Sequence, residues 1–140
     1  MRADAMIKIR AAQKKDAQKI LAILKALDLY HPVKIPDDFF VAEINGEIAG
    51  VSCLADRGDF LFLSSVGVVP GHRQEGIARQ MLQHILSGAK KDIYLYTIIP
   101  GFFKKFGFEI VKTPKFLPSR EGLGCEDCRL PNCVCMRKTP

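Results

Sequence analysis

The chain has 140 residues, 48% of them hydrophobic and 26% charged, and a net charge of +6. These values predict one soluble globular domain with a packed core. They exclude a membrane-spanning helix, because no apolar run approaches the roughly 20 residues that a bilayer requires. No arginine-rich run or aromatic–basic pattern points to a nucleic-acid partner. Residues 1–5 lack the apolar core of a signal peptide, so we expect a disordered leader and a cytoplasmic protein.

The hydrophobic periodicity predicts helices and strands in a mixed order. In chain order these are a strand at 7–11, a helix at 16–29, strands at 39–44, 47–54 and 60–69, a helix at 77–87, a strand at 92–98, a short helix at 100–105 and a strand at 108–111. Asn45-Gly46 predicts a hairpin turn, since both positions tolerate positive φ. From Thr113 onward, prolines and weak periodicity predict a mostly irregular tail.

This order predicts an α+β fold, a mixed α/β arrangement in which helices pack on a sheet. It does not alternate cleanly enough for a doubly wound sheet. We expect a main domain over residues 6–112, and a cysteine-rich extension over 113–140 that packs on the same domain.

The most informative segment joins the strand at 60–69 to the following helix. The strand ends at Pro70, a short loop with Arg73 and Gly76 follows, and a helical pattern starts at once. A helix N-terminus presents backbone N–H groups that favour a phosphate, and a glycine allows close approach of an anion. The segment therefore predicts an anion-binding turn.

Two motifs then resemble the GNAT family of N-acetyltransferases. The first is Arg73-Gln74-Glu75-Gly76-Ile77-Ala78 after a strand that ends near a proline, and the second is Phe102-Phe103-Lys104-Lys105-Phe106-Gly107-Phe108. The resemblance covers about residues 6–112 and implies a central, mostly antiparallel twisted sheet flanked by helices. It also implies that the protein is an enzyme that uses acetyl-CoA.

The resemblance assigns the cofactor-binding residues. The loop amides would hold the diphosphate at the helix N-terminus, and the preceding strand would pair with the pantetheine arm. In this chain the resemblance places these contacts at Val66, Gly67, Val68, Arg73, Gln74, Glu75, Gly76, Ile77 and Ala78. Arg73 would add positive charge beside the diphosphate, and a glycine at 67 suits a bulge or close approach by a ligand.

The catalytic acid and base are less clear in the sequence. Many family members have tyrosine where this chain has Phe103, which cannot donate a proton. Tyr94 or Tyr96 is a candidate acid, and protonation of the leaving thiolate by water is the alternative. The candidate bases are Glu43, His31 and His72, each of which can equally be a structural or solvated side chain.

Four cysteines lie close together in the tail. Cys125, Cys128, Cys133 and Cys135 fall within eleven residues, which in a cytosolic chain favours metal over disulfides. They form a candidate structural zinc site, with free thiols or an oxidised pair as the alternatives. A similar tail follows a Leu-Pro in the N-acetylglutamate synthase-like branch of the family, although that branch usually has an acidic residue at the place of Cys135.

The leading interpretation is acetyl transfer to a small-molecule primary amine, such as the amino acid glutamate. One alternative is acetylation of a protein or peptide amine. The other is a non-catalytic acyl-CoA- or metal-binding sensor. We expect neither a nucleic-acid nor a membrane partner, and the sequence leaves a homodimer open.

Overall fold

The computed structural model describes residues 7–27, 29, 35–72, 76–117 and 133–140, so the expected leader at 1–5 lies outside the described residues. The elements in chain order are β1 (Ile7–Ala11), a 3-10 helix (Lys14–Asp16), α1 (Ala17–Ala26), β2 (Phe39–Ile44), β3 (Glu47–Asp56), β4 (Leu61–Val68), a second 3-10 helix (Pro70–His72), α2 (Ile77–Leu86), β5 (Ile93–Thr97), α3 (Pro100–Lys104), β6 (Glu109–Val111) and β7 (Val134–Lys138). No helix among these residues is long and apolar enough to cross a membrane.

The strands form one seven-stranded sheet in the order β1-β2-β3-β4-β5-β7-β6. β4 and β5 pair in parallel, and every other neighbouring pair is antiparallel. The expected mixed fold with a mostly antiparallel sheet is therefore confirmed. The hairpin between β2 and β3 is confirmed as well, since Asn45 (φ 53°) and Gly46 (φ 82°) both adopt the left-handed conformation that its turn requires.

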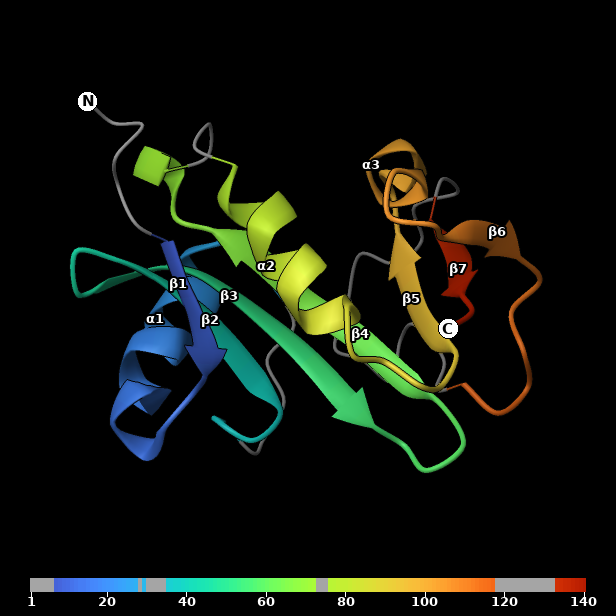
Figure 1. Ribbon diagram of the computed structural model, residues 1–140, viewed down its shortest axis with the longest axis horizontal. Coiled ribbons are helices and arrows are strands. Elements are labelled where there is room, and N and C mark those ends of the chain that lie inside the picture. Colours follow the sequence, from blue (N-terminus) through green and yellow to red (C-terminus); the bar gives the residue numbers. More distant parts are fainter. Residues whose placement is uncertain (1–6, 28, 30–34, 73–75, 118–132) are drawn as a thin grey trace.

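Helices cover both faces of the sheet. Along β2, alternate side chains belong to different cores, because successive residues of a strand point to opposite faces. Phe39 and Val41 pack with residues of α1, whereas Ala42 packs with Ile77 and Met81 of α2. Figure 1 shows α2 crossing in front of the strands and α3 above the end of β5. We call these two sides the α1 face and the α2 face.

The structure corrects the prediction for the end of the chain. Residues 134–138, expected to be irregular, form β7, which lies between β5 and β6 and pairs with both. Met136 on β7 is fully buried in the α2-face core. A five-residue strand after a proline-rich stretch gives little periodicity, so its two neighbours in the sheet, rather than its own pattern, determine its structure. The remaining tail residues, 118–132, lie outside the described part.

Two element ends differ from the sequence prediction by more than one residue. α1 ends at Ala26 rather than near residue 29, although the Leu29 amide still donates to the carbonyl of Leu24 at 2.8 Å. β3 continues to Asp56 instead of ending at residue 54. Element ends are weakly encoded, and the Leu29 bond keeps that residue close to α1 after the helix has ended.

Candidate functional site

β4 and β5 begin as neighbours and then diverge. Their parallel ladder contains the pairs Leu61–Ile93 and Phe62–Tyr94 between the described strands, and from Leu63 onward β4 is not held by β5. Figure 1 shows β5 rising toward α3 while β4 continues behind α2. The main chain of β4 beyond Phe62 therefore lies where an extended ligand can approach it in place of a strand.

A bulge in β4 coincides with this divergence. The register with β3 shifts between Val51 and Cys53, so that Ser65 and Val66 of β4 together oppose one residue of β3. Ser65 has a φ of 56°, which is rare for a residue other than glycine. A bulge bends a strand, increases its twist and turns its peptide groups. The bulge thus reorients the β4 main chain next to the residues that the sequence predicts to hold the pantetheine arm.

Gly67 follows the bulge and contacts the end of the α1 segment. A Cβ atom at this position would lie 2.7 Å from Cδ1 of Leu29 and 2.8 Å from Cδ1 of Leu27. The close approach that the glycine predicted is thus made, in this structure, by two leucines on the α1 face. Both leucines are half-buried and extend the core beneath α1 to the end of β4.

The N-terminus of α2 lies just after the end of β4. Gly76 precedes the helix with a φ of 73°, and its carbonyl accepts the first helical hydrogen bond from the Gln80 amide at 3.0 Å. Helix geometry leaves the amides before this bond without a helical acceptor. Ile77 is buried against the sheet, so this residue can reach a ligand only through its main chain. Residues 73–75 lie outside the described part, so the structure does not place Arg73, Gln74 or Glu75.

The two candidate tyrosines on β5 differ in position. Tyr94 is buried and packs edge-on against Phe60 (ring centroids 5.6 Å apart) at the paired start of β4 and β5. Tyr96 is half-buried, packs edge-on against Phe62 (5.8 Å) and lies past the last β4–β5 pair. Tyr96 is therefore the better placed of the two to reach a group bound between the diverging strands.

Glu43 belongs to an ion-pair network. Arg10 donates to Glu43 Oε2 at 3.0 Å and to Asp16 Oδ2 at 2.8 Å. Hydrogen bonds from the Arg10 guanidinium lower the pKa of both carboxyl groups. A lowered pKa makes Glu43 a weaker base. β3 separates its strand from β4, which puts Glu43 about 10 Å across the sheet from the diverging edge.

Phe103 and His72 lie on either side of the proposed cofactor loop in the sequence, and Phe103 cannot donate a proton. Phe103 is buried in the α2-face core, where its ring packs edge-on against Phe102 and Phe108. The phenylalanine that replaces the family's usual tyrosine thus contributes to packing in this chain. His72 ends the 3-10 helix after β4 and is half-buried, and His31 lies outside the described residues.

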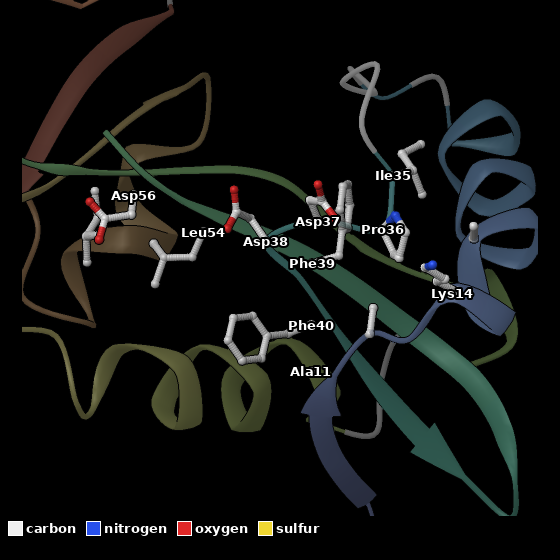
Figure 2. Close-up of a pocket in the computed structure, with 13 residues that line it drawn as sticks. Ala11, Lys14, Ile35, Pro36, Asp37, Asp38, Phe39, Phe40, Leu54 and Asp56 are labelled. Carbon is white, nitrogen blue, oxygen red and sulfur yellow. The ribbon is translucent and has the colours of Figure 1, made fainter. Parts of the chain in front are cut away.

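An open cavity of about 820 Å³ lies at the opposite end of β4, next to Leu61. Its floor is apolar, and Figure 2 shows Phe40 and Ala11 below the aspartates at positions 37, 38 and 56. The carboxylate of Asp56 accepts a hydrogen bond from Lys91 at 2.8 Å. This cavity includes none of the predicted cofactor residues, and we do not assign it to the predicted site.

The described cysteines of the tail lie at β7. Cys135 is buried beside Tyr94 and Leu117, and Cys133 is half-buried just before the strand. Cys125 and Cys128 lie outside the described residues. Among the residues that the structure places, no group of three or more His, Cys, Asp or Glu is arranged to hold a metal ion. The four-cysteine site remains a prediction.

The chain is similar in sequence to known acetyltransferases. Residues 36–110 match the family model described as "Acetyltransferase (GNAT) domain". The chain is similar to "N-alpha-acetyltransferase 50" of Danio rerio, with 33% identity over 110 residues that cover 60% of this chain and 65% of that protein. The chain thus spans less than two thirds of the length of this curated relative.

Solved structures share the fold. N-acetylglutamate synthase from Neisseria gonorrhoeae, in complex with coenzyme A and N-acetyl-glutamate, superposes with a TM-score of 0.74 and 19% identity over 96% of this chain and 35% of that chain. Naa50 from Arabidopsis thaliana, in complex with the bisubstrate analogue CoA-Ac-MVNAL, superposes with a TM-score of 0.66 and 20% identity. The match covers 96% of this chain and 99% of that chain. At these identities the likeness establishes the fold alone.

Proposed function

The chain belongs to the GNAT acetyltransferase family, and from that membership we propose that it transfers an acetyl group from acetyl-CoA to a primary amine. The observation that carries the proposal is the divergence of β4 from β5 immediately before a helix N-terminus. The first feature offers main-chain donors and acceptors to an extended arm, and the second offers amides to a diphosphate.

Two adjoining segments would bind the two parts of acetyl-CoA. The loop and helix start, residues 73–78, would hold the diphosphate through main-chain amides, and Arg73 would add charge. Val66, Gly67 and Val68 would run beside the pantetheine arm. A glycine suits position 76, because the residue before α2 has a left-handed φ of 73°.

The chemical step needs little more than orientation and one proton donor. The amine nitrogen attacks the thioester carbon, the nitrogen–carbon bond forms and the carbon–sulfur bond breaks. A main-chain N–H at the bulge can stabilise the developing oxyanion, because the bulge turns peptide groups out of the regular ladder. Tyr96 can protonate the departing thiolate, with water as the alternative donor, and the amine loses its proton to a base or to solvent.

The acceptor has two candidate classes. The name of the Danio rerio relative indicates transfer to an α-amino group, and the Neisseria structure is of an enzyme named for glutamate acetylation. A small amine such as glutamate and the N-terminus of a peptide are therefore both candidates. The alternative of a non-catalytic acyl-CoA sensor predicts cofactor binding without turnover for any amine.

Calorimetric titration with acetyl-CoA tests the cofactor site. We expect wild type to bind, and Gly76→Val to weaken binding about tenfold or more, because a β-branched residue is strained at positive φ. Gly76→Asn is the matched control, since asparagine tolerates this conformation and should retain most of the affinity. Arg73→Glu should weaken binding without changing the fold. Failure of wild type to bind, or equal binding by all three variants, would contradict the proposal.

Turnover with a panel of amines tests the enzyme itself. We expect Tyr96→Phe to lower kcat about tenfold or more while the KM for acetyl-CoA stays near wild type, since general acid catalysis contributes roughly 100-fold or more. The alkaline limb of the kcat–pH profile should change as well. Tyr94→Phe is the matched control, because Tyr94 is buried at the paired end. Equal effects of the two changes would remove Tyr96 from the mechanism.

A structural zinc ion in the tail is a separate proposal. Cys135 lies on β7, and Cys133 comes directly before the strand, two positions earlier. With Cys125 and Cys128 they would supply four thiolates. Metal analysis of protein purified without chelator tests it. Less than about a tenth of an equivalent of zinc would contradict a structural site.

A further inference from the structure

The apolar contact between Gly67 and the residues that follow α1 bears on the choice of acceptor. Cδ1 of Leu29 and Cδ1 of Leu27 lie 2.7 and 2.8 Å from the position that a Cβ atom at residue 67 would take, so a larger residue there would have to displace the ends of both side chains. This contact lies on the α1 face, at the segment proposed to run beside the thioester. Two leucine side chains therefore lie beside the segment that we propose to hold the thioester.

Further apolar side chains lie at the ends of β4 and β5. Val69 follows β4 and packs on the same core as the two leucines. On the other strand, Ile98 and Ile99 come directly after β5 and are 53% and 55% exposed. Two adjacent isoleucines exposed to this extent at the open end of a strand are unusual, and such surface often marks a ligand site.

Arg10, a cation on the α1 face, is already bound by both Asp16 and Glu43, so it is not available to an acidic acceptor. Moving a carboxylate from water onto a leucine surface is unfavourable when no cation or hydrogen-bond donor compensates for the lost hydration. The same transfer is favourable in free energy for an apolar side chain.

From these contacts we infer that the acceptor carries an apolar side chain next to the reacting amine, packed against Leu27 and Leu29, and that glutamate is not the preferred acceptor. This inference rests on the proposed acetyl transfer. It specifies an α-amine whose first side chain is leucine- or methionine-like. The amine lies at the open end of β4, and the apolar side chain takes up the surface beside Gly67.

The test compares acceptors that differ at one residue. Synthetic tetrapeptides of one sequence, beginning with Leu, Met, Glu or Lys, are assayed with acetyl-CoA and the full chain, together with free L-glutamate. We expect kcat/KM for the Leu and Met peptides to exceed that for the Glu peptide and glutamate by about tenfold or more, the discrimination that one apolar group provides.

Substitutions at the leucines locate the effect. Leu29→Ala should lower kcat/KM for the Leu and Met peptides and leave the Glu peptide nearly unchanged, and Leu29→Asp should raise the relative use of the Lys peptide. Acetyl-CoA affinity, measured by calorimetry, should stay near wild type and shows that the variants are folded. Ile110→Ala, an exposed position on the edge strand β6, is the matched control.

Each outcome decides the question. A Glu peptide or free glutamate acetylated as well as the Leu peptide overturns the apolar acceptor while leaving the acetyltransferase intact. The same reduction for every peptide in Leu29→Ala also overturns it, because the leucine would then be only structural. If no amine is acetylated, the proposed function itself fails and this inference fails with it.

Discussion

The two ends of β4 are built in opposite ways. At the N-terminal end, Leu61 and Phe62 pair with β5, and Phe60 packs edge-on against Tyr94. At the C-terminal end the ladder with β5 has stopped, the strand is bulged, and Gly67 contacts two leucines that follow α1. Regular pairing stabilises the N-terminal end of β4. The C-terminal end does not pair with β5, and its exposed main chain can bind a ligand.

The comparison implies that stability and function can be changed separately. Substitutions at the paired end should lower the free energy of unfolding without altering the affinity of the folded protein for acetyl-CoA. At the open end, the substitution proposed at Gly76 should lower the affinity for acetyl-CoA, and those proposed at Leu29 should change the choice of acceptor. The following predictions run from the largest expected effect to the smallest.

Loss of an aromatic ring at the paired end should have the largest effect. Phe62 is 3% exposed and packs against Tyr96. We expect Phe62→Ala to lower the free energy of unfolding by about 3–4 kcal/mol, because it leaves a cavity in the core. Urea unfolding followed by circular dichroism measures this. A loss below about 1 kcal/mol would show that the paired end does not stabilise the sheet.

Loss of Arg10 should have an intermediate effect, at a site away from both ends of β4. Asp16 is nearly buried, and removal of its cation leaves a carboxylate without an ion pair. We expect Arg10→Met to cost about 2 kcal/mol at neutral pH, between the values for exposed and buried pairs. Acetyl-CoA affinity should not change, since the network lies on β1, β2 and the start of α1.

The effect of Arg10 should depend on pH in a defined direction. The native pKa of Asp16 is lowered, chiefly by its hydrogen bond from Arg10. A lowered pKa stabilises the fold above the unfolded pKa of about 4, and this stabilisation is lost as the pH falls through the native value. The stability gap between wild type and Arg10→Met should therefore be constant near neutrality and shrink in acid. A gap that widens in acid would contradict this assignment.

Loss of the exposed ion pair near the paired end should have the smallest effect. Lys91 and Asp56 are 2.8 Å apart, but their side chains are 37% and 59% exposed. Lys91→Ala should cost about 0.5 kcal/mol or less, and the difference should vanish in concentrated salt. Thermal melts of both proteins at low and high salt measure it. A cost above about 1 kcal/mol would mean that this pair contributes to the closure of β4 on β5.

Much of the fold could be predicted from the sequence because local chemistry determines it. Asn45-Gly46 specifies its hairpin, and Gly76 specifies the left-handed residue before α2. In both places the backbone conformation favours few residue types. The sequence did not predict the divergence of β4 and β5, because it depends on how many residues of two distant segments pair with each other.

Long-range contacts account for what the sequence did not predict. β7 is a strand because β5 and β6 both pair with it, although its own residues carry little periodicity. Glu43 was a candidate base until its pairing with Arg10 from another strand gave it a structural partner. The leucines that contact Gly67 lie about 40 positions earlier in the chain, and the glycine alone indicated only that something approaches closely.

Amide hydrogen exchange of the full chain with and without acetyl-CoA tests the central claim most directly, because it reports on both ends of β4 at once. The account predicts new protection in peptides that cover residues 64–69 and 76–80, with no change at residues 61–62 and 93–94. Protection at the paired end or around the cavity of Figure 2, or none at the open end, would contradict it.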